Sequence, residues 1–332
     1  MVENSPQNHP APPRAASHEG VKRALAKIAQ LLAPTPLLPL EVDGRTIWCK
    51  AENLQPIGAF KIRGAWHRMS DLTADEAARG VVGVSSGNHA QGVAWAAKRL
   101  GIHATIVMPT DAPRAKIAAT EALGAKIAYY DRPKGEDRDA IAQRIADENG
   151  ATIVHAYADP WVIEGQGSMG LEAAEQLSQR GIDGPDNIIA CCAGGGLSSG
   201  LALACPDADI WGVEPEGWDD VARSLAAGEI LSVADISFPT ECDALQAMST
   251  KPINFAILQA RGVRVVSVTR AEVRHAMRLA FARLHIVLEP GGAAALAAVL
   301  AGKVPLTDAT MVTLSGGNVD ADLFAAILNE TP

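Results

Sequence analysis

The sequence predicts an α/β protein whose sheets are mostly parallel and flanked by helices. Short β-branched runs alternate with alanine-rich amphipathic stretches along most of the chain, as in VVGVSS (81–86) followed by HAQGVAWAAKRLG (89–101). The strand runs are apolar almost throughout, which is expected when helices cover both faces of a sheet. This alternation predicts successive strand–helix units with right-handed crossovers, and no repeat of fixed period is present.

The elements follow one another in a regular order. The apolar spacing from Val21 to Leu32 is helical, and Pro34 and Pro36 end that first helix. Eight strands are then expected at 81–86, 104–109, 125–131, 153–156, 187–196, 209–215, 264–269 and 310–317. The helices that follow them are expected at 89–101, 113–124, 138–150, 167–181, 197–205, 220–228, 271–284 and 321–328.

Length and charge limit the kinds of partner. With 332 residues and 48% hydrophobic content, the chain can bury a large core and is expected to form two domains. The net charge is −9 and no dense Lys/Arg stripe occurs, which argues against a nucleic-acid or anionic-membrane surface. A small molecule is therefore the expected partner.

The cysteines and the amino-terminal stretch indicate a cytoplasmic protein. The five cysteines include no C-x-x-C, and their odd number favours reduced thiols over a disulfide framework. Residues 1–18 are rich in Pro, Asn and Ser without the apolar core of a signal peptide, so a disordered segment is expected. No stretch has the length of apolar sequence that a membrane span needs.

Four turns contain residues suited to chemistry, because ligands of such folds bind beyond the carboxyl ends of strands. The first includes Lys61 in FKIRGA. An amine in a partly apolar pocket loses solvation of its charged form, which favours the neutral nucleophile that a Schiff base requires. The alternative is a surface lysine whose stem lies along a helix.

The second turn is SSGNHAQG, between a strand and a helix. Ser86, Gly87 and Asn88 could present hydroxyl, amide and helix amino-terminal N–H groups to a carboxylate. An ordinary helix N-cap would use the same residue types.

The third turn is AGGGLSSG, in which three consecutive glycines allow backbone N–H groups to approach a phosphate. A competing interpretation is a dinucleotide site of a nicotinamide-dependent dehydrogenase. Gly194 and Gly196 begin a G-x-G-x-x-G pattern, and Glu214 stands twenty residues after Gly194. Ser199 occupies the sixth position of that pattern, which weakens this interpretation.

The fourth turn is LSGGNVD, where Ser315 could cap a helix or bond a ring nitrogen. A lysine, a glycine turn and a hydroxyl would all be used by one cofactor with a carbonyl, a phosphate and a ring nitrogen. Pyridoxal phosphate has these three features.

With these four motifs in this order, the chain resembles the fold-type II pyridoxal-phosphate enzymes, in particular the serine/threonine dehydratase and serine racemase group. The resemblance covers residues from about 20 to 328. It implies two open, mostly parallel sheets flanked by helices, with a large cofactor-binding domain (19–79 and 158–332) and a small domain (80–157). It also implies a homodimer.

The resemblance implies a role for each motif residue. Lys61 would form the Schiff base, Phe60 would stack near the ring, and Asn88 would bond the ring 3-oxygen. The backbone N–H groups that would hold the phosphate belong to Gly194, Gly195, Gly196 and Leu197, and Ser315 would face the pyridine nitrogen. The substrate carboxylate would bind at the turn of Ser85, Ser86, Gly87, Asn88 and His89. The chain departs from the pattern at Ala193 and Ala59, where relatives usually carry glycine and serine.

The implied reaction is β-elimination on L-threonine or L-serine, which gives 2-oxobutyrate or pyruvate and ammonia. Ser86 leaves an alternative open, because a serine there serves racemases of the group as the acid/base on the opposite face, yet it would equally bond the carboxylate or cap the helix. A serine or aspartate racemase and a 3-hydroxyaspartate dehydratase are therefore alternatives. A non-catalytic cofactor-binding protein is a further one.

Two other expectations concern the rest of the chain. In EPEGWDD, Glu214, Asp220 and the carbonyl of Trp218 match a divalent-cation site of part of the family, for Mg²⁺ or Ca²⁺, although a solvated acidic loop is the alternative. The chain ends soon after SGGNVD, so a regulatory domain with feedback control by isoleucine is not expected. His155, Met248 and Pro290 could line the pocket for the substrate side chain, or simply pack.

Overall fold

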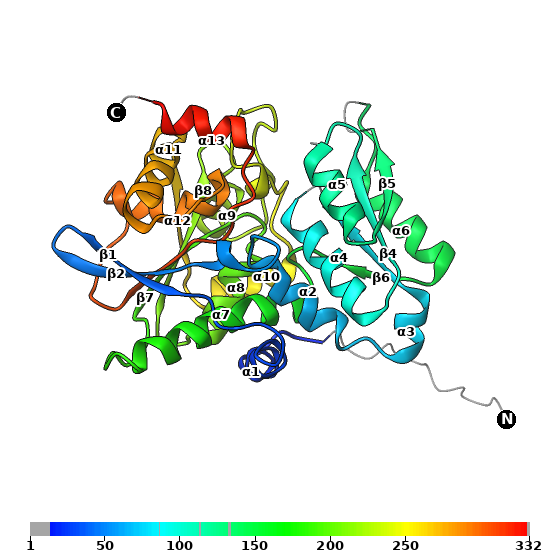
Figure 1. Cartoon of the computed structure of the whole chain (residues 1–332), viewed down its shortest axis with the longest axis horizontal. Coiled ribbons are helices and arrows are strands. Elements are labelled where there is room, and N and C mark those ends of the chain that lie inside the picture. Colours follow the sequence, from blue (N-terminus) through cyan, green and yellow to red (C-terminus); the bar gives the residue numbers. More distant parts are fainter. Residues whose placement is uncertain (1–13, 86, 113, 132–133, 331–332) are drawn as a thin grey trace.

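Two open sheets form the framework of the protein (Figure 1). The structure, a computed structural model, describes residues 14–85, 87–112, 114–131 and 134–330. The larger sheet has the strand order β1-β2-β10-β7-β8-β9, and the smaller has the order β5-β4-β3-β6. Every neighbouring pair of strands is parallel except β1 and β2. The predicted α/β fold with mostly parallel sheets is confirmed.

The strands and helices have the following bounds in the described ranges. The larger sheet contains β1 (Leu37–Val42), β2 (Arg45–Lys50), β7 (Asn187–Cys191), β8 (Asp209–Pro215), β9 (Arg264–Val268) and β10 (Thr310–Thr313), and the smaller contains β3 (Val81–Val84), β4 (Ala104–Pro109), β5 (Lys126–Tyr130) and β6 (Thr152–Val154). The helices are α1 (His18–Ile28), α2 (Lys61–Met69), α3 (Ala74–Arg79), α4 (Asn88–Leu100), α5 (Arg114–Ala122), α6 (Arg138–Asn149), α7 (Pro160–Ser178), α8 (Gly196–Ala204), α9 (Asp220–Ala227), α10 (Pro252–Ala260), α11 (Arg270–Leu279), α12 (Pro290–Leu300) and α13 (Ala321–Leu328). Single turns at Glu52–Leu54, Asp243–Leu245 and Ala280–Leu284 complete the elements.

Helices α3 and α10 have no counterpart among the predicted helices, and the structure differs from the sequence prediction in three further respects. The antiparallel hairpin of β1 and β2 was not predicted, and its turn uses positive φ angles at Asp43 (50°) and Gly44 (74°). Helix α12 was not predicted because its residues are buried on every side, so that no amphipathic period is visible. Helix α7 begins earlier than expected, because the Asp159 carboxylate accepts hydrogen bonds from the amides of Trp161 and Val162 and so caps it there.

The two sheets are built from the segments that the predicted domain boundaries assign to them. The smaller sheet and its helices come from one continuous stretch, which forms the right side of Figure 1. The chain before and after this stretch forms the larger sheet. The domain boundaries themselves stay a prediction.

Of the amino-terminal segment 1–18, residues 1–13 lie outside the described residues and residues 14–18 are described. From Arg14 onward, the chain contacts α7: the Arg14 guanidinium donates to the Glu164 carboxylate at 2.6 Å, and the Ser17 hydroxyl caps α1. In the described ranges, none of the helices combines the length and the apolar character needed to cross a bilayer. All five cysteines are free and buried.

A fully buried ionic network anchors α2 to its neighbours. The Arg63 guanidinium donates to both oxygens of Glu52 at 2.7 Å, and to the two oxygens of Glu172 at 2.8 and 3.1 Å. The Lys50 ammonium donates to Glu172 at 2.5 Å. Two cations and two carboxylates therefore balance in charge where little water reaches them, which is the condition under which buried charges are tolerated. The network fixes the helix that begins with Lys61.

Candidate active site

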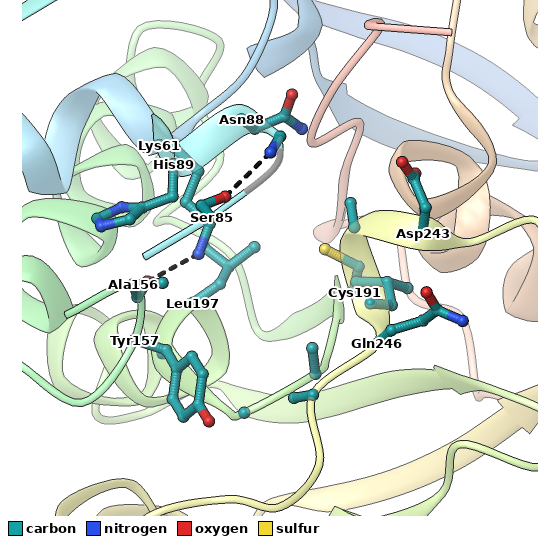
Figure 2. Close-up of a pocket in the computed structure, with 18 of the residues that line it drawn as sticks. Lys61, Ser85, Asn88, His89, Ala156, Tyr157, Cys191, Leu197, Asp243 and Gln246 are labelled. Atoms are coloured by element: carbon teal, nitrogen blue, oxygen red, sulfur yellow. Dashed lines mark hydrogen bonds between the residues drawn. The ribbon is translucent and has the colours of Figure 1, made fainter. Parts of the chain in front are cut away.

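One pocket between the two sheets brings the four predicted turns together. Its lining includes Phe60 and Lys61 at the start of α2, the described residues of the 85–89 turn, the glycine turn from 193 to 197, and Ser315. Figure 2 shows Lys61, Ser85, Asn88, Tyr157 and Cys191 directed around this pocket. The turns are separated by up to about 250 residues in sequence, and they meet because strands of parallel sheets place their carboxyl ends at one edge.

Lys61 is the first residue of α2, and its amine lies inside the pocket. The Nζ atom donates a hydrogen bond to the Ala156 carbonyl at 2.8 Å and lies 5.0 Å from the centre of the Phe60 ring. Burial lowers the pKa of Lys61 from 10.5 to about 8. A substantial fraction of this amine is therefore neutral near physiological pH, which makes it both a nucleophile and a base.

Both ends of the Asn88 side-chain amide form hydrogen bonds, one with the pocket residue Glu289 and one with Asn318. Its Nδ2 donates to Oε1 of Glu289 at 2.5 Å, and its Oδ1 accepts a hydrogen bond from Nδ2 of Asn318 at 2.7 Å. Burial, with a smaller effect of the Asp243 carboxylate, raises the pKa of Glu289 to about 7. The orientation of the Asn88 amide is therefore fixed by two partners, which lie about 200 and 230 residues away in sequence.

The glycine turn leads from β7 into α8. Gly195 has a φ of +87°, and a Cβ built on Gly194 would lie 2.2 Å from the Tyr157 ring, so both positions require glycine. The Thr250 hydroxyl donates to the Gly194 carbonyl at 3.1 Å and holds the turn from the other side. Amides of the first turn of α8, at Gly196 and the residue after it, have no carbonyl partner within the helix and attract an anion.

Ser315 follows β10 and lines the pocket. Its backbone carbonyl accepts a hydrogen bond from the Phe60 amide at 3.1 Å, which ties the two turns together. Its hydroxyl oxygen accepts a hydrogen bond from the Cys191 thiol at 3.2 Å. Because the thiol donates, the Ser315 hydrogen stays available for an acceptor in the pocket.

The turn between β3 and α4 contains the residues that the sequence predicts for the substrate carboxylate, and its described residues line the pocket. The Ser85 hydroxyl accepts a hydrogen bond from the Gly87 amide at 3.1 Å, and Asn88 begins α4. The Nε2 of His89 donates to the Val154 carbonyl at 2.8 Å, and burial lowers the pKa of His89 to about 3, so its ring is neutral. Ser86, predicted as a catalytic residue, lies outside the described residues.

The predicted metal residues form a buried acidic pair outside the pocket lining. Both oxygens of Glu214 accept hydrogen bonds from amides of α9 at 3.0 Å, and Oδ2 of Asp220 accepts one from the Thr250 amide at 2.9 Å. Burial raises the pKa of Glu214 well above its usual value and that of Asp220 to about 7. The Trp218 indole donates to the Phe238 carbonyl at 3.0 Å. Because Glu214 does not line the pocket that contains the glycine turn, a ribose-binding role for this residue is not favoured.

In the described ranges, no group of three or more His, Cys, Asp or Glu side chains could hold a metal. The acidic pair therefore supplies two side-chain ligands at most, and further ligands would have to be carbonyl oxygens or water.

Several pocket residues were not identified from the sequence. They are Lys116, Arg138, Tyr157, Cys191, Asp243 and Glu289. They lie in stretches with no motif of their own, although the position of Glu289 just before a helix-starting proline could have drawn attention to it. The three candidates for the side-chain pocket are placed elsewhere: Met248 is 44% exposed, Pro290 is buried, and His155 lines a neighbouring cavity.

This arrangement fits pyridoxal phosphate on structural grounds. The amine with a lowered pKa, the glycine turn whose shape a Cβ would destroy, and the neutral hydroxyl of Ser315 lie around one pocket. The amine matches the carbonyl of that cofactor, the glycine turn matches its phosphate, and the hydroxyl matches its ring nitrogen.

Comparison with known proteins agrees with this fit. The sequence pattern of the family described as "Pyridoxal-phosphate dependent enzyme" matches residues 28–316. The serine racemase of Schizosaccharomyces pombe is 36% identical, over 95% of this chain and 98% of its own length. The L-threo-3-hydroxyaspartate ammonia-lyase of Pseudomonas sp is 37% identical, over 94% of this chain and 98% of its own.

Among solved structures, a threonine deaminase from T.th. superposes with a TM-score of 0.84. It is 39% identical, and the match covers 92% of this chain and 99% of that one. The named activities of these three relatives differ, whereas the fold and the cofactor are common to the family. The chain therefore belongs to the pyridoxal-phosphate dependent enzymes of fold type II, with pyridoxal phosphate as its cofactor.

Proposed function

We propose that this enzyme catalyses β-elimination on L-3-hydroxy amino acids, releasing ammonia and a 2-oxo acid, with L-serine and L-threonine as substrates. The observation that carries the proposal is the buried amine of Lys61, whose pKa is about 8, in the same pocket as a neutral Ser315 hydroxyl. The threonine deaminase and hydroxyaspartate ammonia-lyase relatives support an elimination reaction.

In this proposal, the chain holds both the cofactor and the substrate. Bound pyridoxal phosphate supplies a conjugated electron sink that lowers the pKa of the substrate Cα–H. The amides of the glycine turn would hold its phosphate, and Ser315 would face its ring nitrogen. Amides of the 85–89 turn, at the positive end of α4, bind the substrate carboxylate.

Lys61 moves the proton in this scheme. Its neutral amine takes the hydrogen from Cα, and the Ala156 carbonyl, 2.8 Å from Nζ, accepts one of the N–H hydrogens of the resulting ammonium. The Ser315 hydroxyl carries no charge, so it does not favour a protonated ring nitrogen as a carboxylate would. A weaker electron sink favours rapid loss of the β-hydroxyl over transamination.

A screen of hydroxy amino acids tests the proposal. Release of 2-oxo acid from L-serine or L-threonine is expected, with little change in the configuration of the remaining substrate. Rapid racemisation without release of 2-oxo acid would instead identify a racemase, an activity that the serine racemase relative keeps open. Absence of both reactions from every hydroxy amino acid would refute the proposed reaction.

A second candidate substrate is 3-hydroxyaspartate, favoured by two cations in the pocket lining. Lys116 and Arg138 both line the pocket, and Lys116 forms an ion pair with Asp243. Because Asp243 already neutralises Lys116, a second carboxylate on the substrate would complement Arg138, whereas the side chains of serine and threonine carry no charge.

Replacement of Arg138 by Gln separates the two candidates. If 3-hydroxyaspartate is the substrate, kcat/KM for it is expected to fall by about 10- to 100-fold, because a charge-assisted hydrogen bond is lost. The value for L-serine is expected to change little. Arg144→Gln, at an exposed position of the same helix, is the matched control. Equal losses for both substrates would contradict a carboxylate-binding role for Arg138.

We also propose that Glu214, Asp220 and the Trp218 carbonyl bind Mg²⁺ or Ca²⁺. The raised pKa values of both carboxyl groups support this proposal, because burial makes their charged forms costly unless a cation neutralises them.

The stability of the cation-free protein should then depend on pH. The folded-state pKa of Asp220 lies above its unfolded value, so its contribution to stability is present below about pH 4 and lost as the pH rises through about 7. We expect Mg²⁺ or Ca²⁺ to raise the melting temperature clearly at pH 8 and little at pH 5, as measured by scanning calorimetry. Asp220→Asn should remove this shift, whereas Asp235→Asn at an exposed site should not. A shift that persists in Asp220→Asn would place the cation elsewhere.

A homodimer and a cytoplasmic location complete the proposal. Five free, buried cysteines suit a reducing compartment. Sedimentation velocity on the cofactor-loaded protein would test the dimer.

A further inference from the structure

The connection between β6 and α7, residues 155–159, contacts several parts of the site at once. The carbonyl of Ala156 accepts the hydrogen bond of the Lys61 amine at 2.8 Å, drawn as a dashed line in Figure 2. The next residue, Tyr157, lies against the glycine turn, 2.2 Å from a Cβ built on Gly194. The connection therefore touches both the amine that attacks the cofactor and the turn that holds its phosphate.

The connection is held in place on its other side by hydrogen bonds to the larger sheet region. The Tyr157 carbonyl accepts a hydrogen bond from Nδ2 of Asn254 at 2.9 Å, and the Tyr157 hydroxyl donates to the Ser249 carbonyl at 3.1 Å. Asp159 caps α7 and accepts a hydrogen bond from Arg68 at 3.1 Å. None of these contacts involves the peptide group that joins the Ala156 carbonyl to the Tyr157 amide.

His155 does fix that peptide. Its Nδ1 accepts hydrogen bonds from two amides, that of Tyr157 at 3.2 Å and that of Ala158 at 3.0 Å. Since both partners are N–H donors, Nδ1 carries no hydrogen and the ring hydrogen is on Nε2. The ring also packs edge-on against Tyr157, with centroids 4.6 Å apart. Burial lowers the pKa of His155 to about 4, so the ring stays neutral at physiological pH.

We propose that His155 is a positioning residue that holds the Ala156 carbonyl against Lys61 and Tyr157 against the glycine turn. It contacts neither the reacting amine nor the phosphate site, and it acts through the two amides that it binds. The inference concerns cofactor binding by this chain, and it does not depend on which amino acid is the substrate. Loss of the ring would leave two amide donors unpaired in a half-buried turn, which favours rotation of the turn.

Three variants test this role through the affinity of the apoprotein for pyridoxal phosphate, measured by fluorescence titration. His155→Ala is expected to raise the dissociation constant by at least about 10-fold. This is the effect expected when two hydrogen bonds between uncharged groups are lost. The dissociation constant of His155→Asn should stay within about 3-fold of the wild-type value. An Asn side-chain oxygen can accept hydrogen bonds from the backbone amides two and three residues later in the chain, as the His155 ring does. The matched control is His103→Ala, at an exposed position of the smaller sheet region.

Two outcomes of this titration would overturn the proposal. One is wild-type affinity in His155→Ala. The other is an equal loss in His155→Asn and His155→Ala while circular dichroism and the melting temperature show both to be folded.

A measurement on the wild-type protein keeps the proposal testable if His155→Ala does not fold. Nitrogen-15 NMR of labelled histidines should show a ring with hydrogen on Nε2 only, unchanged between pH 5.5 and 8.5. The His155 signal is assigned by its absence from His155→Asn. The charged groups around the ring, which this titration must take into account, are Lys61, Arg138, Asp139 and Lys251. A hydrogen on Nδ1, or protonation near neutral pH, would exclude the two hydrogen bonds and overturn the proposal.

Discussion

Replacement of Lys61 by Ala is expected to lower kcat by about 10⁴-fold or more, because in the proposed reaction one amine serves as both the nucleophile and the base. The variant should also lose the covalent link to the cofactor. Turnover of the best hydroxy amino acid measures the first effect. Mass spectrometry after borohydride reduction measures the second, and it should find a pyridoxyl adduct on residue 61 of the wild type only.

Two further variants serve as controls. One tests whether the positive charge of Lys61 is sufficient, and the other tests the effect of removing a lysine elsewhere in the chain. Lys61→Arg keeps the positive charge but cannot condense with an aldehyde, so it should be as inactive as Lys61→Ala. Lys22→Ala removes a lysine whose side chain is 54% exposed and should behave as the wild type. A coloured, active Lys61→Ala would refute the assignment of this residue, whatever the substrate proves to be.

Replacement of Arg63 by Met is expected to lower the free energy of unfolding by about 3–5 kcal/mol. The change leaves Glu52 and Glu172 buried with only the Lys50 ammonium to neutralise them, while the volume of the side chain is roughly kept. Urea denaturation of the apoprotein, followed by circular dichroism, measures this loss. Because Arg63 stands two residues after Lys61 on α2, weaker binding of pyridoxal phosphate should accompany the loss of stability.

The matched control for this effect is Arg45→Met. Arg45 pairs with Asp308 at 3.3 Å, but the two side chains are 50% and 78% exposed, so the expected change in unfolding free energy is about 0–1 kcal/mol. The contrast depends on burial and on the number of partners, since Arg63 pairs with two buried carboxylates and Arg45 with one exposed carboxylate. Equal effects of the two substitutions would show that the buried network does not anchor α2.

The parallel part of the fold could be predicted from the sequence because each strand is an apolar run and most of the helices are amphipathic. Residues 81–86 and 89–101, for example, correspond to β3 and α4 in the structure. The prediction failed where this local signal is absent. Helix α12 is apolar on all sides, and β1 contains a proline inside its run of LLPLEV, so neither shows a clear period.

The residues of the candidate site divide in the same way. Lys61, the glycine turn and Ser315 stand in short contiguous motifs, and the structure places them in one pocket. Glu289 and Arg138 have no such motif, because their positions in the pocket depend on where α12 and α6 lie relative to the sheets. The sequence makes His155 a candidate for substrate contact, whereas the structure shows its ring accepting two backbone hydrogen bonds.

The sequence by itself determined the order of strands and turns, the residue types at each turn and, through them, the family and the cofactor. These properties depend on neighbouring residues, whose backbone preferences and side-chain chemistry act locally. Only the tertiary structure decided which groups are buried and which distant groups meet. The lowered pKa of Lys61, the pairing of Asn88 with Glu289 across 201 residues, and the neutral network around Arg63 all arise from exclusion of water, which requires the packed fold.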